Sequence, residues 1–135
     1  MRIIYWIDVT AFLVFAGFVV THTPWSAIHI IGIAMAAIGF VLWMLARVQL
    51  GKSFAITAQA KALVTHGLYA KFRHPVYVFA AVAFTGLIVA WNARLAPFYL
   101  LLYCLTQGLR TRKEDAVLEQ EFGEEYRRYK ARTWF

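Results

Sequence analysis

The segment 67–77 contains the side chains with the greatest capacity for chemistry. Arg73 and His74 stand directly before Pro75, a residue that fits the first turn of a helix because its missing N–H costs nothing there. His74 is therefore predicted near the N-cap, where free backbone N–H groups and the helix dipole favour an anion. Arg73 adds a guanidinium fork that suits a carboxylate. The segment is prepared to hold a negatively charged group, and anchoring of a helix end to lipid headgroups is the alternative of equal weight.

A second candidate is the pair of adjacent carboxylates Glu114 and Asp115, which follows Arg112 and Lys113. Ionised carboxylates accept charge-assisted hydrogen bonds, so the pair suits an ammonium group or two ribose hydroxyls. Taken alone, the pair favours a simpler interpretation. In that interpretation the two acids stand in the first turn of a solvated helix and complement its dipole.

The elements that must position these residues are apolar. Hydrophobic residues make up 61% of the 135 residues and charged residues 16%, whereas soluble domains have about 45–50% and about 25%. A soluble fold of this size cannot bury so much apolar surface, but a bilayer can cover it. We therefore predict an all-α integral membrane protein, a single domain with four transmembrane helices. The predicted spans are residues 3–20, 27–46, 76–91 and 95–109.

The distribution of basic residues predicts the orientation of these spans. If both termini are cytoplasmic, every lysine and arginine except Arg94 falls on the cytoplasmic side, at the N-terminus, in the loop 47–75 or in the tail 110–132. Such a skew follows the positive-inside rule. We therefore predict a multi-pass protein with cytoplasmic termini and with its chemistry facing the cytoplasm. The net charge of +7 needs no nucleic-acid partner, because no recognisable nucleic-acid-binding module accompanies it.

The tail 110–132 is predicted to form an amphipathic helix, since its apolar residues follow helical spacing. These residues are Leu118, Phe122, Tyr126 and Tyr129. Gly123 interrupts the pattern at a modest cost. The pattern leaves open whether this helix lies on the membrane surface or folds back over the loop 47–75.

Several residues within the predicted spans are interpreted as structural. Small residues let membrane helices approach closely, so two small-residue faces are expected to pack against neighbouring helices: Gly32, Ala36 and Gly39, and Ala80, Ala83 and Gly86. An interfacial aromatic belt is predicted from Trp6, Trp25, Trp43 and Trp91. Asp8 is expected near the membrane interface rather than facing a cavity in the bundle.

No metal site is predicted. His22 and His29 lack a third ligand and are interpreted as structural. Cys104 has no nearby base within its helix turn that would make it a nucleophile, and it is interpreted as a small hydrophobe.

Together, the two polar clusters resemble the superfamily of isoprenylcysteine carboxyl methyltransferases and phospholipid methyltransferases. The resemblance covers residues 50–129 and combines Leu-Gly-x-x-Phe, Gly-x-Tyr, Arg-His-Pro-x-Tyr, a carboxylate pair and Leu-x-x-x-Phe-Gly-x-x-Tyr-x-x-Tyr. The matching residues are Leu50, Gly51, Phe54, Gly67, Tyr69, Arg73, His74, Pro75, Tyr77, Glu114, Asp115, Leu118, Phe122, Gly123, Tyr126 and Tyr129.

The resemblance implies a membrane enzyme that uses S-adenosylmethionine and methylates a lipophilic acceptor that enters from the bilayer. It implies cofactor contacts from His74, Tyr77 and Glu114 first, and from Tyr69, Arg73 and Asp115 next. Arg73 and Glu114 are expected to position the reactants, and no residue is assigned a catalytic step. An isoprenylcysteine carboxylate, a phospholipid amine and a small thiol are all candidate acceptors.

Two other functions remain open at this point. Membrane reductases of the sterol type share a similar carboxy-terminal architecture and use NADPH, and a non-catalytic membrane protein is the third alternative. Four spans also leave open whether a second copy of the chain completes the pocket as a homo-oligomer.

Overall fold

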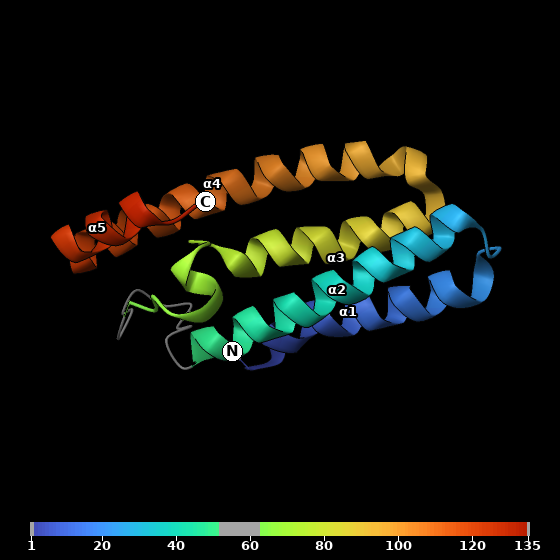
Figure 1. Ribbon diagram of the computed structural model, residues 1–135, viewed down its shortest axis with the longest axis horizontal. Helices are drawn as coiled ribbons and strands as arrows, with labels where there is room; N and C mark the ends of the chain where they lie inside the picture. Colours follow the sequence, from blue (N-terminus) through green and yellow to red (C-terminus); the bar gives the residue numbers. More distant parts are fainter. Residues whose placement is uncertain (1, 52–62, 135) are drawn as a thin grey trace.

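The computed structural model describes residues 2–51 and 63–134, and it is helical almost throughout these ranges (Figure 1). The all-α prediction is therefore confirmed for the described residues. In chain order the elements are α1 (Arg2–His22), α2 (Ala27–Leu50), the 3-10 helix η2 (Gly67–Ala70), α3 (Pro75–Asn92), the 3-10 helix η3 (Ala93–Leu95), α4 (Ala96–Phe122) and α5 (Glu124–Arg132).

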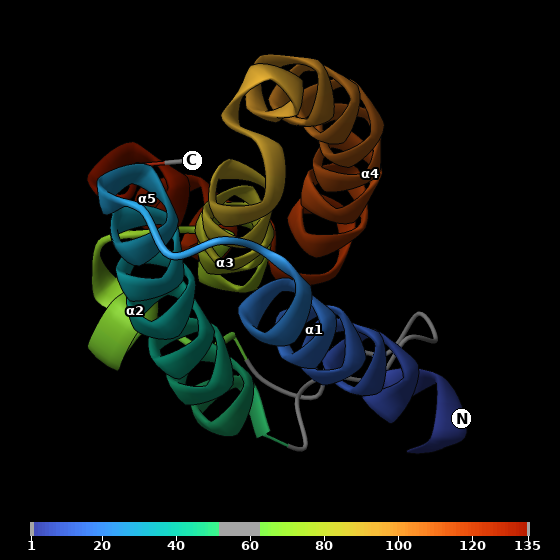
Figure 2. The same ribbon diagram turned by 90° about the vertical axis from the view of Figure 1, so that its right-hand side faces the viewer.

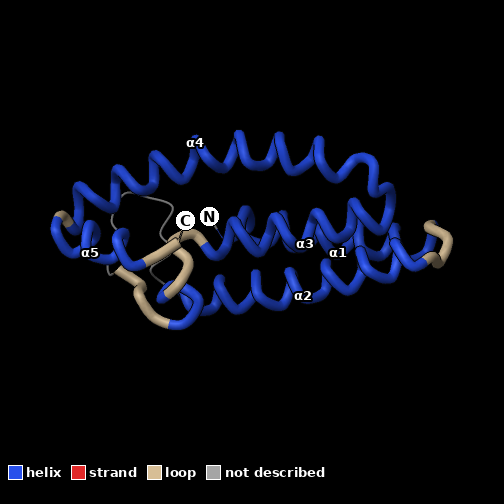
Figure 3. The backbone as a smooth tube through the Cα atoms, turned by 45° about the horizontal axis from the view of Figure 1, so that its top comes forward, coloured by secondary structure: helices blue, strands red, loops and turns tan. Residues whose placement is uncertain are grey.

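The long helices run up and down along one axis. Helices α1, α2 and α3 lie side by side, and α4 returns along α3 on the other side of the bundle (Figures 1 and 2). The turn between α1 and α2 and the turn at η3 lie at one end, whereas both termini lie toward the other end (Figure 1). The tube in Figure 3 shows that α5 and the loop before α3 meet at this second end.

The closest helix pair is α2 and α3, and small residues allow its approach. A Cβ atom added to Gly86 would lie 2.4 Å from the backbone nitrogen of Ala36, and one added to Gly39 would lie 2.5 Å from that of Ala83. No side chain fits in such spaces, so the two backbones are in direct contact. The prediction that both small-residue faces pack against neighbouring helices is confirmed, and they pack against each other.

Aromatic rings fill the space between α1 and this helix pair. Phe12 stacks on Phe40 at 4.9 Å and meets the edges of Phe84 and Trp43 at 5.2 and 6.0 Å. Trp43 is only 1% exposed, so its predicted place in an interfacial belt is wrong. The ring lies in the core because it packs against Phe12 and Phe84 at 6.0 and 5.8 Å, whereas Trp6, Trp25 and Trp91 are exposed.

Two helical stretches, Ala27–Leu50 and Pro75–Phe122, are long and apolar enough to cross a membrane. Large apolar side chains cover their outer surfaces, including Ile31, Ile38 and Val48 on α2 and Phe98, Leu102 and Leu105 on α4. A bilayer would cover such surfaces more favourably than water. These observations support a membrane protein at this coarse level, and the four spans and their orientation stay predictions.

Two helices, α2 and α4, run several residues past their predicted ends. The predicted boundary between a span ending at 109 and a tail helix starting at 110 does not exist, because α4 continues to Phe122. No proline stands at that point, Gly108 keeps the helical conformation, and a change from apolar to charged side chains does not interrupt the backbone. The helix ends instead at Gly123, where φ is +51°, a conformation that glycine adopts readily. Likewise, α2 continues past residue 46 to Leu50. Most of the first half of the predicted loop 47–75, residues 52–62, lies outside the described residues.

Candidate functional site

The two polar clusters meet at the end of the bundle that holds the termini. Arg73 Nη1 donates to Asp115 Oδ2 at 2.8 Å, and His74 Nε2 lies 2.8 Å from Asp115 Oδ1. One turn further along α3, Tyr77 Oη donates to Glu114 Oε1 at 2.5 Å. We call this set of five residues the α3–α4 junction. Five of the six predicted site residues thus come together, although 37 or more positions separate the two groups along the chain.

Local sequence explains why the α3 side of the junction is fixed. Pro75 occupies the first turn of α3, which makes His74 the N-cap residue. The backbone carbonyl of His74 accepts hydrogen bonds from the N–H groups of Tyr77 and Val78 at 3.1 and 3.2 Å. The imidazole ring is therefore held at the start of the helix, beside the anion-favouring end of its dipole. The anion that lies there is the carboxylate of Asp115 in the same chain.

Asp115 also joins the junction to the tail. Tyr126 Oη on α5 donates to Asp115 Oδ1 at 2.5 Å, and Lys130 Nζ lies 3.7 Å from Oδ2. Burial raises the pKa of this carboxyl, but the hydrogen bonds from Tyr126 and His74 and the nearby charges of His74 and Arg73 outweigh it, so the pKa lies below its usual value. Asp115 is thus an ionised group whose partners come from α5 and from the segment that leads into α3.

The end of the chain holds the loop before α3 in place. Arg73 N donates to the Trp134 carbonyl at 2.9 Å, and Trp134 N donates to the Lys71 carbonyl at 2.7 Å. Tyr129 Oη donates to the Tyr69 carbonyl at 2.8 Å. Burial raises the pKa of Tyr129 to about 12, with a smaller effect from the charges of Arg73 and Asp115. Of the two positions predicted for the tail helix, the structure shows the one folded back over the loop.

The side chain of Glu114 is more exposed to solvent than that of its neighbour Asp115. Its side chain is 39% exposed, against 17% for Asp115. Besides Tyr77, it contacts Arg110 Nε at 3.3 Å, and its Oε2 lies 3.8 Å from His74 Nδ1. A half-exposed carboxylate can accept further hydrogen bonds from a ligand. Of the two acids, Asp115 holds the junction together and Glu114 is available at its surface.

Tyr69, the sixth predicted site residue, belongs to the buried core rather than to the junction. Its described link to the tail is the backbone carbonyl that accepts from Tyr129. This position in η2 lets Tyr69 align the loop that leads to Arg73.

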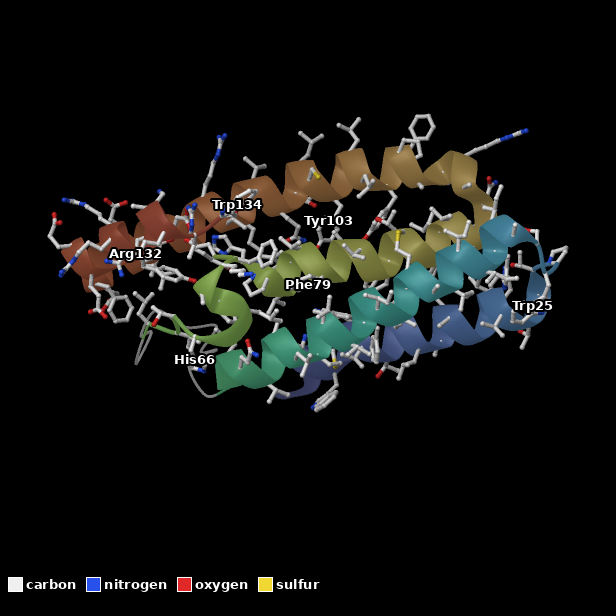
Figure 4. All side chains as sticks on the ribbon, viewed as in Figure 1. Trp25, His66, Phe79, Tyr103, Arg132 and Trp134 are labelled. Carbon is white, nitrogen blue, oxygen red and sulfur yellow. The ribbon has the colours of Figure 1, made fainter. Side chains whose placement is uncertain are left out.

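Several polar residues on α4 were missed by the sequence analysis. They stand four positions apart on the partly buried side of α4, in line with the predicted residue Asp115: Tyr99, Tyr103, Gln107 and Thr111. Tyr103 Oη donates to the Tyr77 carbonyl at 2.8 Å, and Figure 4 shows Tyr103 on the side of α4 that faces α3. The spacing of four is a helical face, so this polar stripe in an apolar helix was visible in the sequence.

Two buried polar atoms, one in the junction and one on the partly buried side of α4, have no hydrogen-bond partner in the described part of the chain. One is the donor Arg73 Nε and the other is the acceptor Gln107 Oε1. Buried polar groups are nearly always paired, so each is a point where a bound molecule can supply the missing partner.

The residues considered for metal binding lie elsewhere. His29 is buried, with Nδ1 3.2 Å from the Ala90 carbonyl, whereas His22 contacts Thr21 and the carbonyl of Phe18. Cys104 is exposed on α4. Among the described residues there is no group of three side chains that could hold a metal ion.

A family model matches residues 2–133, which include the whole junction and the tail. The chain belongs to the DUF1295 family. The family is described as proteins of unknown function. It lies in a group of membrane proteins that resemble steroid reductases and methyltransferases. No curated protein matches the chain. Membership in the family therefore assigns no activity to this site.

Proposed function

We propose that this member of the DUF1295 family is an S-adenosylmethionine-dependent methyltransferase that acts on a lipophilic, membrane-partitioned acceptor. In this proposal the chain crosses the membrane four times, both termini are cytoplasmic, and the α3–α4 junction faces the cytoplasm. The observation that carries the proposal is the convergence of Arg73, His74 and Tyr77 with Glu114 and Asp115. These are the residues of the motif pair that resembles the membrane methyltransferases.

The free hydrogen-bonding groups at the junction suit this cofactor. S-adenosylmethionine has one carboxylate, one ammonium and two ribose hydroxyls. The unpaired donor Arg73 Nε suits the carboxylate, and the half-exposed carboxylate of Glu114 suits the ammonium or the hydroxyls. Asp115 is occupied by partners of its own chain, so its role is to hold Arg73 and His74 in position.

A junction of this kind can support methyl transfer without a strong acid or base. When bound, the cofactor supplies an electrophilic methyl group on a sulfonium sulfur. The chain's own contribution is orientation, since effective concentration and alignment account for much of the rate enhancement in such reactions. The hydrogen bonds among Tyr77, Glu114 and Arg110 fix the side chains that would provide this orientation.

Calorimetry on the purified chain in detergent tests the proposal with S-adenosylmethionine and with its demethylated product. We expect both to bind. The Glu114→Gln variant should bind at least roughly tenfold more weakly, which corresponds to about 1.4 kcal/mol. Glu119→Gln is a matched control, because Glu119 lies on the same helix, is 38% exposed and pairs with an arginine. The absence of binding to the folded wild-type chain would refute the proposal.

The group to which the family belongs makes a reductase the competing function. Excess NADPH should fail to displace S-adenosylmethionine in the same assay. If NADPH binds instead and S-adenosylmethionine does not, the junction belongs to a reductase.

A further inference from the structure

The guanidinium of Arg110 covers part of the α3–α4 junction. Arg110 stands on α4 one turn before Glu114, and its Nε atom donates to Glu114 Oε1 at 3.3 Å. Its Cζ atom lies 5.3 Å from the centre of the Tyr77 ring, a distance at which a cation is attracted to the face of an aromatic ring. Tyr77 and Glu114 therefore form a cation site, and the cation that lies there is a side chain of the same chain.

The two walls of this cation site are joined to each other directly. Tyr77 Oη donates to Glu114 Oε1 at 2.5 Å, and Glu114 Oε2 lies 3.8 Å from His74 Nδ1. The ring comes from α3 and the carboxylate from α4. If Arg110 moves away, these contacts still hold the ring and the carboxylate together, and Glu114 Oε1 regains a position at which it can accept a hydrogen bond from a ligand.

Arg110 is held more weakly than the other arginine of the junction. The side chains of Arg110 and Glu114 are 53% and 39% exposed, and an exposed ion pair of this kind contributes little to stability. Arg73 and Asp115, by contrast, are only 15% and 17% exposed. A ligand can therefore displace Arg110 into solvent while the contact between Arg73 and Asp115 stays intact.

The nature of the present occupant indicates which cation of the proposed cofactor would replace it. A guanidinium is more weakly hydrated than an ammonium and packs on aromatic faces. A sulfonium has no N–H group, and its charge is spread over the sulfur and its three carbon substituents, so it is also weakly hydrated. We propose that the sulfonium of S-adenosylmethionine takes the place of the Arg110 guanidinium over the Tyr77 ring, beside the charge of Glu114. This inference rests on the proposed function.

The displacement of Arg110 would distinguish the cofactor from its demethylated product. In methyl transfer an electron pair of the acceptor forms the new bond to the methyl carbon as the C–S bond breaks. The electron pair of the broken bond stays on sulfur, and any proton that the acceptor loses goes to water. The sulfur is then neutral and is no longer attracted to the ring and the carboxylate. Arg110 returns to Tyr77 and Glu114, which makes it a residue that determines specificity for the charged ligand.

Calorimetry on the full chain in detergent tests the proposal, with S-adenosylmethionine and its demethylated product as the two ligands. Arg110→Met removes the competing guanidinium. We expect this variant to bind S-adenosylmethionine about threefold more tightly than the wild-type chain does, which is the size of an exposed ion pair, and to bind the product with unchanged affinity. Arg112→Met is the matched control, because Arg112 is an exposed arginine of the same helix, and it should change neither affinity. Equal gains for both ligands, or weaker binding of S-adenosylmethionine, would overturn the proposal.

Two variants of Tyr77 test the role of the ring. Both lose the hydrogen bond to Glu114, but Tyr77→Phe keeps an aromatic face and Tyr77→Leu does not. The readout is the dissociation constant of S-adenosylmethionine divided by that of the product, because general damage to the site changes both constants. We expect this ratio to stay unchanged in Tyr77→Phe and to rise about threefold in Tyr77→Leu. The same ratio in both folded variants would overturn the role of the ring.

Trimethylsulfonium tests the cation site without the rest of the cofactor, and dimethyl sulfide is its neutral control. Trimethylsulfonium should raise the thermal midpoint of Arg110→Met more than that of the wild-type chain, whereas dimethyl sulfide should raise neither. The absence of a rise with trimethylsulfonium would overturn the proposal. If S-adenosylmethionine binds but Arg110→Met changes the affinities of both ligands equally, only this inference fails. If trimethylsulfonium stabilises Arg110→Met but S-adenosylmethionine does not bind, the proposed function fails and the cation site stands.

Discussion

The interface between α2 and α3 and the junction between α3 and α4 are built on opposite principles. The first brings two backbones into direct contact through glycine and alanine. The second joins helices through charged and hydroxyl side chains at one end, and of all the residues in α4 only Ala96 is fully buried. Dense packing leaves no room for a ligand, whereas a polar junction with open groups such as Glu114 can receive one.

The difference assigns separate roles to the two regions. Close packing of α2 and α3 resists deformation and supplies a fixed platform for Arg73, His74 and Tyr77 at the start of α3. The junction has few buried apolar contacts and is therefore expected to open more easily than the platform. Binding residues commonly lie on segments that such a rigid scaffold positions.

The largest loss of stability is expected when a side chain is added where α2 and α3 are in contact. In Gly86→Ala the new Cβ would lie 2.4 Å from a backbone nitrogen and 2.7 Å from a carbonyl oxygen of α2. The helices must separate, at a cost of about 3 kcal/mol in the free energy of unfolding. Gly108→Ala on α4 is the control, because its Cβ would meet nothing within 4 Å and alanine favours a helix. Equal thermal midpoints for the two variants would refute the account of this interface.

A smaller loss is expected when the junction is broken. Asp115→Asn removes a charge that receives hydrogen bonds from Arg73, His74 and Tyr126. We expect a cost of about 2 kcal/mol, since hydrogen bonds to charged groups contribute roughly 1.5–3 kcal/mol. Limited proteolysis should then cleave the tail sooner, while the α2–α3 region stays protected. Glu124→Gln, at an exposed site of the same tail, should leave the cleavage rate unchanged. Equal cleavage rates for Asp115→Asn and the wild-type chain would contradict this role of Asp115.

Tyr129→Phe tests the link between the tail and the loop before α3. It removes the hydrogen bond to the Tyr69 carbonyl and keeps the ring. The expected cost is about 1 kcal/mol, measured as a shift in the thermal midpoint. If the variant were as stable as the wild-type chain, the tail would not hold this loop.

The smallest expected effect concerns pH. The pKa of Asp115 is lowered on folding, so the unfolded chain binds more protons at this site than the native chain. The contribution of ionised Asp115 to the free energy of unfolding is therefore fully present above the ordinary carboxyl pKa of about 3.9. It is lost as the pH falls through the lower pKa that Asp115 has in the folded chain. Thermal midpoints measured from pH 6 to pH 3 should fall more steeply for the wild-type chain than for Asp115→Asn. Parallel slopes would contradict the depressed pKa.

Sequence reasoning predicted the local parts of this structure well. Pro75 after His74 predicted the start of α3, and the small residues of α2 and α3 predicted close packing, because both signals depend on neighbouring positions in one helix. The motif pair also predicted which segments would meet. The sequence did not reveal that Asp115 would pair with Arg73 and His74 of the same chain while Glu114 stays partly exposed. Which of the two acids faces Arg73 and His74 depends on how α4 is rotated against α3.

The wrong predictions also concern properties that neighbouring positions in the sequence do not determine. Trp43 was placed at a membrane interface from its position near a segment end, but its location depends on aromatic partners from α1 and α3. The predicted end of the last span followed hydropathy, which reports on the environment of a helix rather than on its backbone. The sequence analysis also did not include the ion pair between Asp8 on α1 and Arg47 on α2, because no local pattern indicates a contact between different helices.

The most direct test of the α3–α4 junction as a cofactor site is photochemical labelling. The wild-type chain would be irradiated with S-adenosylmethionine that is tritiated in its methyl group, digested and mapped. We predict label in peptides that contain residues 69–77 or 110–118, protection by excess demethylated product but not by NADPH, and weaker labelling in Glu114→Gln than in Glu119→Gln. Label confined to other peptides, or label that the demethylated product does not prevent, would contradict the proposed site.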